Sequence, residues 1–138
     1  MLGAVLALLW RRPQLFLFVV AANFLGQIVS SVLRAAIPRD RPPLRYPEPE
    51  PLVGTPASHS FPSGHATSSF ACATILTAAA PRYGPLFYLL ALAIGFSRIY
   101  DGVHYPLDVV GGAVLGIAIA LLLLAAVRWR SSPARQAG

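Results

Sequence analysis

Four stretches of apolar residues, each near the length of a membrane-crossing helix, set the strongest limit on how this chain can fold. They run from Pro13 to about Ile37, from Ser63 to just before Pro81, from about Leu86 to Tyr100, and from about Pro106 to Val127. A helix rises 1.5 Å per residue, so about 20 residues cross a hydrocarbon layer of about 30 Å. We therefore expect an all-α polytopic bundle of about four spanning helices, in one membrane-embedded domain over residues 1–138.

The second stretch is barely long enough to span, and it is rich in Ala, Ser and Thr. Small residues let helices approach closely, so we expect this helix to be buried among the others. Only 12% of the residues are charged, against about 25% in an ordinary soluble domain. All 11 basic residues are Arg, and they lie between and at the ends of the apolar stretches. That placement is typical of a membrane protein and argues against nucleic-acid binding.

Two features within these helices have structural interpretations. Cys72 is the only cysteine and lies in an apolar run, so it can form neither an intramolecular disulfide nor a thiolate metal cluster. We interpret it as a small buried hydrophobic residue. Gly112 and Gly116 form a Gly-x-x-x-Gly pair, which favours packing within the bundle over dimerisation.

Residues 38–62 interrupt the helices with a long loop. Its prolines forbid a continuous helix, and a loop of this length is usually functional or disordered. If every apolar stretch crosses the membrane, this loop and the Asp101–Tyr105 turn lie on one side. The other side receives arginines that resemble topological anchors: Arg11, Arg12, Arg82, Arg128, Arg130 and Arg135. By the positive-inside rule we expect that side to be cytoplasmic, and residues 38–62 to form an outward-facing active-site loop.

Met1–Trp10 is apolar but too short to span the bilayer. Three interpretations stay open for it: an interfacial helix, the tail of an upstream helix, or the remnant of a secretory signal. The last is the weakest, because no basic segment precedes the apolar residues.

Three polar clusters meet on the side of the long loop, although they lie up to about seventy positions apart. They are Arg34 followed after six residues by Arg41-Pro42; Pro62-Ser63-Gly64-His65; and Ser97-Arg98 followed by His104 and, three residues further, Asp108. This convergence predicts a functional site.

Arginine dominates the first and third clusters. Three guanidinium groups, those of Arg34, Arg41 and Arg98, would repel one another unless a multiply charged anion lay between them, and phosphate matches their forked donors. Ser63 and Gly64 open a helix, whose N–H groups and dipole also favour an anion. Gly64 additionally lets the backbone approach a ligand closely. For Arg34 alone, a favourable position at a helix C-terminus is the competing explanation.

His104 and Asp108 are four residues apart, so on a helical turn they share a face. A carboxylate on one ring nitrogen orients the imidazole and leaves the other nitrogen free to attack. His65, on a different helix, can then act as general acid for the leaving group. We expect no metal, because a cation would be repelled by the three arginines and no carboxylate cluster is present. We assign the remaining polar residues no catalytic role: His59, Arg45, Asp40 and Asp101.

The three clusters, in this order, resemble the signature of the type 2 phosphatidic acid phosphatase superfamily, which also includes the vanadium haloperoxidases. The surrounding sequence, Ser60 to Ala66 and Ser97 to Pro106, is similar to the bacterial membrane branch. The resemblance implies an acid phosphatase/haloperoxidase-like helical core. It also implies a phosphohistidine on His104 supported by Asp108, proton donation by His65, and phosphate binding by five residues: Arg34, Arg41, Ser63, Gly64 and Arg98.

Two departures from the family pattern affect these expectations. The first position of the signature is usually Lys, whereas here it is Arg34, whose planar fork would alter the phosphate pose. Membrane members usually have about six spanning helices, and four are visible here. We therefore expect either a minimal member or a chain that lacks the N-terminal pair.

The resemblance implies a cofactor-independent phosphatase in the inner (plasma) membrane, with its site on the extracytoplasmic face and a lipid phosphate or diphosphate as substrate. An isoprenoid carrier such as undecaprenyl diphosphate is the first substrate expected, and phosphatidic acid or phosphatidylglycerol phosphate follows closely. Two alternatives stay open: a non-catalytic lipid-phosphate-binding or transport protein, and a haloperoxidase, which the apolar stretches disfavour. The sequence does not indicate an oligomeric state.

Overall fold

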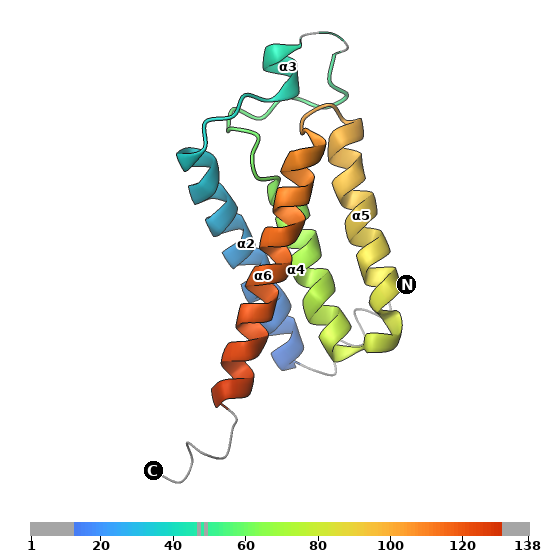
Figure 1. Cartoon of the computed structure of the whole chain (residues 1–138). Coiled ribbons are helices and arrows are strands. Elements are labelled where there is room, and N and C mark those ends of the chain that lie inside the picture. The colour runs from blue at the N-terminus through green and yellow to red at the C-terminus, as the bar shows by residue number, and fades with distance from the viewer. Residues whose placement is uncertain (1–12, 47, 49, 131–138) are drawn as a thin grey trace.

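The computed structural model describes residues 13–46, 48 and 50–130. Four long helices run side by side (Figure 1): α2 (Pro13–Ala36), α4 (Gly64–Ala79), α5 (Gly84–Tyr100) and α6 (Pro106–Arg130). A single turn of helix, α3 (Pro42–Arg45), lies in the long loop, and a 3-10 turn, η1 (Pro81–Tyr83), leads into α5. Helices and loops without a strand make up this described part, which confirms the all-α prediction.

The α4 helix is the centre of the bundle and contacts each of the other three long helices. Its small side chains make this possible, because Ala, Ser and Thr let neighbouring backbones approach closely. Ala71 and Ile75 of α4 pack with Leu15 and Ala22 of α2 and with Ala120 of α6. On its other face, two further α4 residues pack against α5 in a second cluster: Phe70 and Ala73 with Phe87 and Ala91.

The glycine pair of α6 faces α4. A Cβ atom at Gly112 would lie 2.5 Å from the carbonyl oxygen of Ser63, and one at Gly116 would collide with the carbonyl oxygen of Thr67. The two helices can approach this closely only because neither position carries a side chain. Packing within the bundle, the use favoured from sequence, is therefore confirmed.

Among the described residues, three segments are long and apolar enough to cross a membrane: Pro13–Ala36, Pro81–Tyr100 and Pro106–Val127. They present large apolar side chains on their outer faces, including Leu17, Leu92 and Leu122. With 16 residues, α4 extends only about 24 Å at 1.5 Å per residue. The expected bundle of about four spans is therefore three long apolar helices around a shorter, buried fourth.

The polar clusters meet at one end of the bundle, as chain direction predicted. The C-terminus of α2, the long loop, the N-terminus of α4 and the α5–α6 turn all lie at the top of Figure 1. Arg82, in η1, lies at the opposite end. Met1–Trp10, Arg11, Arg12 and Arg135 lie outside the described residues.

Candidate active site

His104 and Asp108 lie at the start of α6, where the chain turns back from α5. Both side chains are buried, with 6% of His104 and none of Asp108 exposed. The ring Nδ1 of His104 lies 3.4 Å from Oδ2 of Asp108. The same carboxylate oxygen accepts the backbone N–H of Tyr105 at 2.9 Å. Asp108 therefore both orients the histidine and closes the first turn of the helix.

Arg39 completes this arrangement, and sequence reasoning missed it. Its Nη1 lies 2.7 Å from the second carboxylate oxygen of Asp108, and its guanidinium lies over the Tyr105 ring, 4.5 Å from the centroid. A fully buried carboxylate needs a countercharge. The need for a countercharge to Asp108 could have drawn attention to Arg39. However, the spacing of the residues in the sequence does not distinguish Arg39 from the other arginines of the loop.

Arg41 is 3% exposed and lies against the other side of the histidine. Its Nη1 donates to the carbonyl of Val103 at 2.9 Å and lies 3.2 Å from Nε2 of His104, while its Nε donates to the carbonyl of Ser58 at 2.8 Å. Burial, reinforced by the charge of Arg34 and opposed by Asp108, lowers the pKa of Arg41. Arg41 therefore links the long loop to His104 through hydrogen bonds.

These contacts assign the tautomer of His104. A guanidinium can only donate, so Nε2 must accept from Arg41 through its lone pair. The ring proton then lies on Nδ1 and faces Asp108. The ring nitrogen that is free to act as a nucleophile is therefore Nε2, and a cationic donor is beside it.

The N-terminus of α4 lies next to this pair. Ser63 is its buried N-cap, and its Oγ accepts the N–H of Ala66 at 3.5 Å. Its own N–H donates to the carbonyl of Asp108 at 2.9 Å, so only its hydroxyl proton is left for a ligand. A Cβ at Gly64 would lie 2.9 Å from Nη1 of Arg34. Glycine thus allows this arginine to cover the positive end of the helix.

Arg34 and Arg98 approach from α2 and α5. Arg34 donates to the carbonyl of Pro62 at 3.3 Å and to Oγ of Ser31 at 2.8 Å. Arg98 pairs with Asp101 at 2.9 Å, so Asp101 does balance a nearby arginine. The charges of Arg34, Arg41 and Arg98 all lie within electrostatic range of His65.

The sequence-predicted residues are therefore brought together at one end of the bundle. His65 projects from the first turn of α4 and is exposed. His59 contributes its backbone carbonyl to Arg41, at 3.3 Å, and Arg45 is an exposed residue at the end of α3. Within the described residues, no group of three or more His, Cys, Asp or Glu side chains is placed to hold a metal ion.

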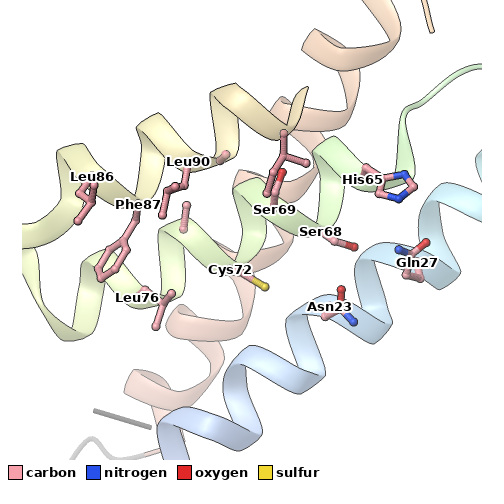
Figure 2. A pocket seen from close by; sticks show the side chains of 13 residues that line it. Asn23, Gln27, His65, Ser68, Ser69, Cys72, Leu76, Leu86, Phe87 and Leu90 are labelled. Carbon is pink, nitrogen blue, oxygen red and sulfur yellow. The ribbon is translucent and has the colours of Figure 1, made fainter. Parts of the chain in front are cut away.

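A cavity of about 500 Å³ opens beside His65 between α2, α4 and α5. Figure 2 shows polar side chains at the end near His65, among them Gln27, Ser68 and Asn23. Toward the other end the lining is apolar and includes Leu76, Leu86, Phe87 and Leu90. The cavity leads from the polar cluster into the part of the bundle that a bilayer would surround.

The sequence profile of the PAP2 superfamily matches residues 15–132. The chain is 33% identical to the bacitracin transport permease protein BcrC of Bacillus licheniformis, over 78% of this chain and 53% of that protein. It is 29% identical to the undecaprenyl-diphosphatase of Sulfolobus acidocaldarius, over 85% of this chain and 58% of that protein. The chain spans between 52% and 66% of the first three curated relatives.

Two solved structures share the fold. Aquifex aeolicus LpxE superposes with a TM-score of 0.78 at 30% identity, over 90% of this chain and 76% of that one. A transmembrane PAP2-type phosphatidylglycerolphosphate phosphatase from Bacillus subtilis superposes with a TM-score of 0.65 at 25% identity, over 95% of this chain and 71% of that one.

Proposed function

The chain belongs to the PAP2 superfamily and is an integral membrane protein, and from that premise we propose that it is a metal- and cofactor-independent lipid phosphatase. One observation carries the proposal. The unprotonated Nε2 of His104 accepts from Arg41 in an arginine-rich site, and the other ring nitrogen of His104 lies against Asp108. A nucleophile oriented by a carboxylate and surrounded by phosphate-binding groups is suited to phosphoryl transfer.

In the proposed reaction, Nε2 of His104 attacks phosphorus, and the bond from phosphorus to the leaving oxygen breaks. The electron pair of that bond stays on the leaving oxygen, which takes a proton from His65. Asp108, with Arg39 as its counterion, stabilises the positive charge that develops on the His104 ring. Water, deprotonated by His65, then attacks the phosphohistidine and releases phosphate.

The phosphate group is held by Arg34, Arg41, Arg98, the hydroxyl of Ser63 and the helix terminus at Gly64. Nη1 of Arg41 donates to Nε2 of His104. A bound phosphate would take over this donor, because a charged oxygen is a stronger acceptor than an imidazole nitrogen. The nitrogen lone pair would then be released at the moment when substrate is present.

The cavity beside His65 supports a lipid rather than a soluble phosphate ester as the substrate. Its apolar end suits hydrocarbon, and its polar end begins at His65, the general acid of the proposed reaction. Undecaprenyl diphosphate is the first substrate we propose, in line with the name of the Sulfolobus relative. Phosphatidylglycerol phosphate, named for the Bacillus structure, and phosphatidic acid follow. We place the enzyme in the inner (plasma) membrane with this site, including the 38–62 loop, on the outer face.

A second candidate is a transport or lipid-phosphate-binding protein without turnover, which the name of the Bacillus licheniformis relative favours. A trapping experiment separates the two. Wild-type protein in detergent, incubated in EDTA with a radiolabelled lipid phosphate, is expected to form an acid-labile, base-stable phosphohistidine, and His104→Ala is expected to form none while keeping its fold. Absence of the adduct together with absence of phosphate release would favour the binding protein, and label on His104→Ala would exclude His104 as the nucleophile.

A further inference from the structure

Three uncharged polar side chains on the wall of the cavity have no hydrogen-bond partner among the described residues. Oγ of Ser68 is buried and unpaired, in a residue that is only 9% exposed. Asn23 is half-buried and Gln27 is exposed, and their side-chain amides take part in no hydrogen bond within the described part of the chain. A polar group buried within a membrane bundle is normally paired, so the unpaired hydroxyl of Ser68, beside two unpaired amides on the same cavity, points to a polar ligand group at this place.

The contacts between α2 and α4 define where these groups lie relative to the phosphate site. The position of a Cβ on Gly64 lies 3.2 Å from Oε1 of Gln27, so this amide is level with the N-terminus of α4. Ser68 is one turn further along α4, and Asn23 is one turn further back along α2, about 5–6 Å deeper in the bundle. Figure 2 shows Asn23 and Ser68 approaching each other from the two helices.

The lining of the cavity therefore changes from polar to apolar side chains along its length. His65 comes first, then the amides and the hydroxyl, and then Leu76, Phe87 and Leu90. A phosphate joined directly to a hydrocarbon would place CH₂ groups against Asn23, Gln27 and Ser68. Their hydrogen-bonding capacity would then stay unused after water is displaced, at a cost in binding free energy.

We propose that Asn23, Gln27 and Ser68 form a subsite for oxygen atoms in a linker between the reacting phosphate and the hydrocarbon chain. The subsite rests on the proposed function and narrows its substrate class. The linker is oxygen-rich: the retained phosphate of a diphosphate, a glycerol ester or a sugar. A lipid monophosphate bonded directly to its hydrocarbon lacks these acceptors and is the poorer substrate.

The test compares two substrates that share one hydrocarbon chain and a third that carries a glycerol ester. Phosphate release by the full chain in detergent is measured with farnesyl diphosphate, farnesyl monophosphate and dioleoyl phosphatidic acid. Ser68→Ala and Asn23→Leu are each expected to lower kcat/KM about fivefold for a linker-bearing substrate, the factor that corresponds to one neutral hydrogen bond. Farnesyl monophosphate is expected to react as with wild type. A lower kcat/KM for the diphosphate alone identifies a retained phosphate as the linker. A lower kcat/KM for phosphatidic acid alone identifies the glycerol ester as the linker.

Ser69→Ala is the matched control. Ser69 also lines the cavity, but its hydroxyl donates within α4 to the carbonyl of Ala66 at 3.2 Å. This variant is expected to treat all three substrates as wild type does. Equal changes with all three substrates in Ser68→Ala and Asn23→Leu, or no change with any, would overturn the subsite.

A binding measurement keeps the test valid without turnover. In a His104→Ala background, Ser68→Ala is expected to weaken the Kd for farnesyl diphosphate about fivefold and to leave that for farnesyl monophosphate unchanged. Wild-type protein that binds these lipids and releases no phosphate would contradict the proposed function while this comparison still decides the subsite. An equal change in the Kd for farnesyl diphosphate and for farnesyl monophosphate would contradict the subsite.

Discussion

At the scale of single residues, the ring of His104 is held from both sides. Asp108 accepts from one ring nitrogen and Arg41 donates to the other, so the tautomer follows from the network. Arg39 acts one step further away, through the carboxylate. We treat it as a positioning residue, because it contacts Asp108 and not the reacting nitrogen.

Removal of Arg39 provides a test of this positioning role. Arg39→Ala is expected to lower kcat by a factor of about 10 to 100, the range of one charge-assisted hydrogen bond, and to change KM little. Arg39→Lys retains the charge and is expected to recover part of kcat. The measurement is steady-state phosphate release.

Arg45→Ala is the control for this prediction, because Arg45 is an exposed arginine of the same loop. It is expected to keep wild-type kcat. A raised KM with unchanged kcat in Arg39→Ala would show instead that Arg39 binds the phosphate group directly.

At the scale of helices, the contact between α4 and α6 holds the two halves of the site together. Ser63, at the start of α4, donates its N–H to the carbonyl of Asp108 in α6. The close approach at Gly112 and Gly116 continues this contact into the bundle. The spacing of these two helices therefore also determines the distance between His65 and His104.

A methyl group at Gly116 should separate the helices. Gly116→Ala places a Cβ against the backbone of Thr67, which cannot move as a flexible side chain would. We expect a loss of about 1–3 kcal/mol in the free energy of unfolding, measured as a lower midpoint of thermal unfolding in detergent.

The control substitution is Ala118→Val, at an exposed position of the same helix. It should leave the midpoint unchanged, because its side chain faces outward. If Gly116→Ala altered the oligomeric state and not the midpoint, dimerisation would be the role of the glycine pair after all.

At the scale of the whole molecule, the polar site lies at one end of the bundle and apolar side chains cover the outer faces of the long helices. The membrane orientation depends on the arginines of the opposite end, of which the described residues place Arg82 in η1. Because the site end also carries arginines, the orientation needs a direct experiment.

Cysteine labelling in intact cells tests the proposed orientation. In a Cys72→Ala background, Val53→Cys in the long loop is expected to react with a membrane-impermeant maleimide added outside. Tyr83→Cys, at the other end, is expected to react only after permeabilisation. Both side chains are exposed, at 40% and 43%, so access to reagent should depend on the side of the membrane. The reverse pattern would place the site in the cytoplasm.

Local sequence patterns alone determined the four long helices and the end of the bundle at which the polar residues meet. The α2 helix was expected from Pro13 to about Ile37 and runs from Pro13 to Ala36. The helix expected from about Leu86 begins at Gly84, because a proline, here Pro85, is tolerated in the first turn of a helix. Helix length and chain direction are local properties, so they could be read without knowledge of packing.

Only the tertiary structure decided the ion pair of Arg39 with Asp108, which joins residues 69 positions apart, and the cavity that begins beside His65. The first depends on the path of an irregular, proline-rich loop, which has no periodicity to reveal which side chains point inward. The second depends on how far α2 and α5 stand from α4, a distance set by the sum of many side-chain contacts. The sequence alone therefore determined the end of the bundle at which the polar residues meet, and packing decided which side chains contact one another there.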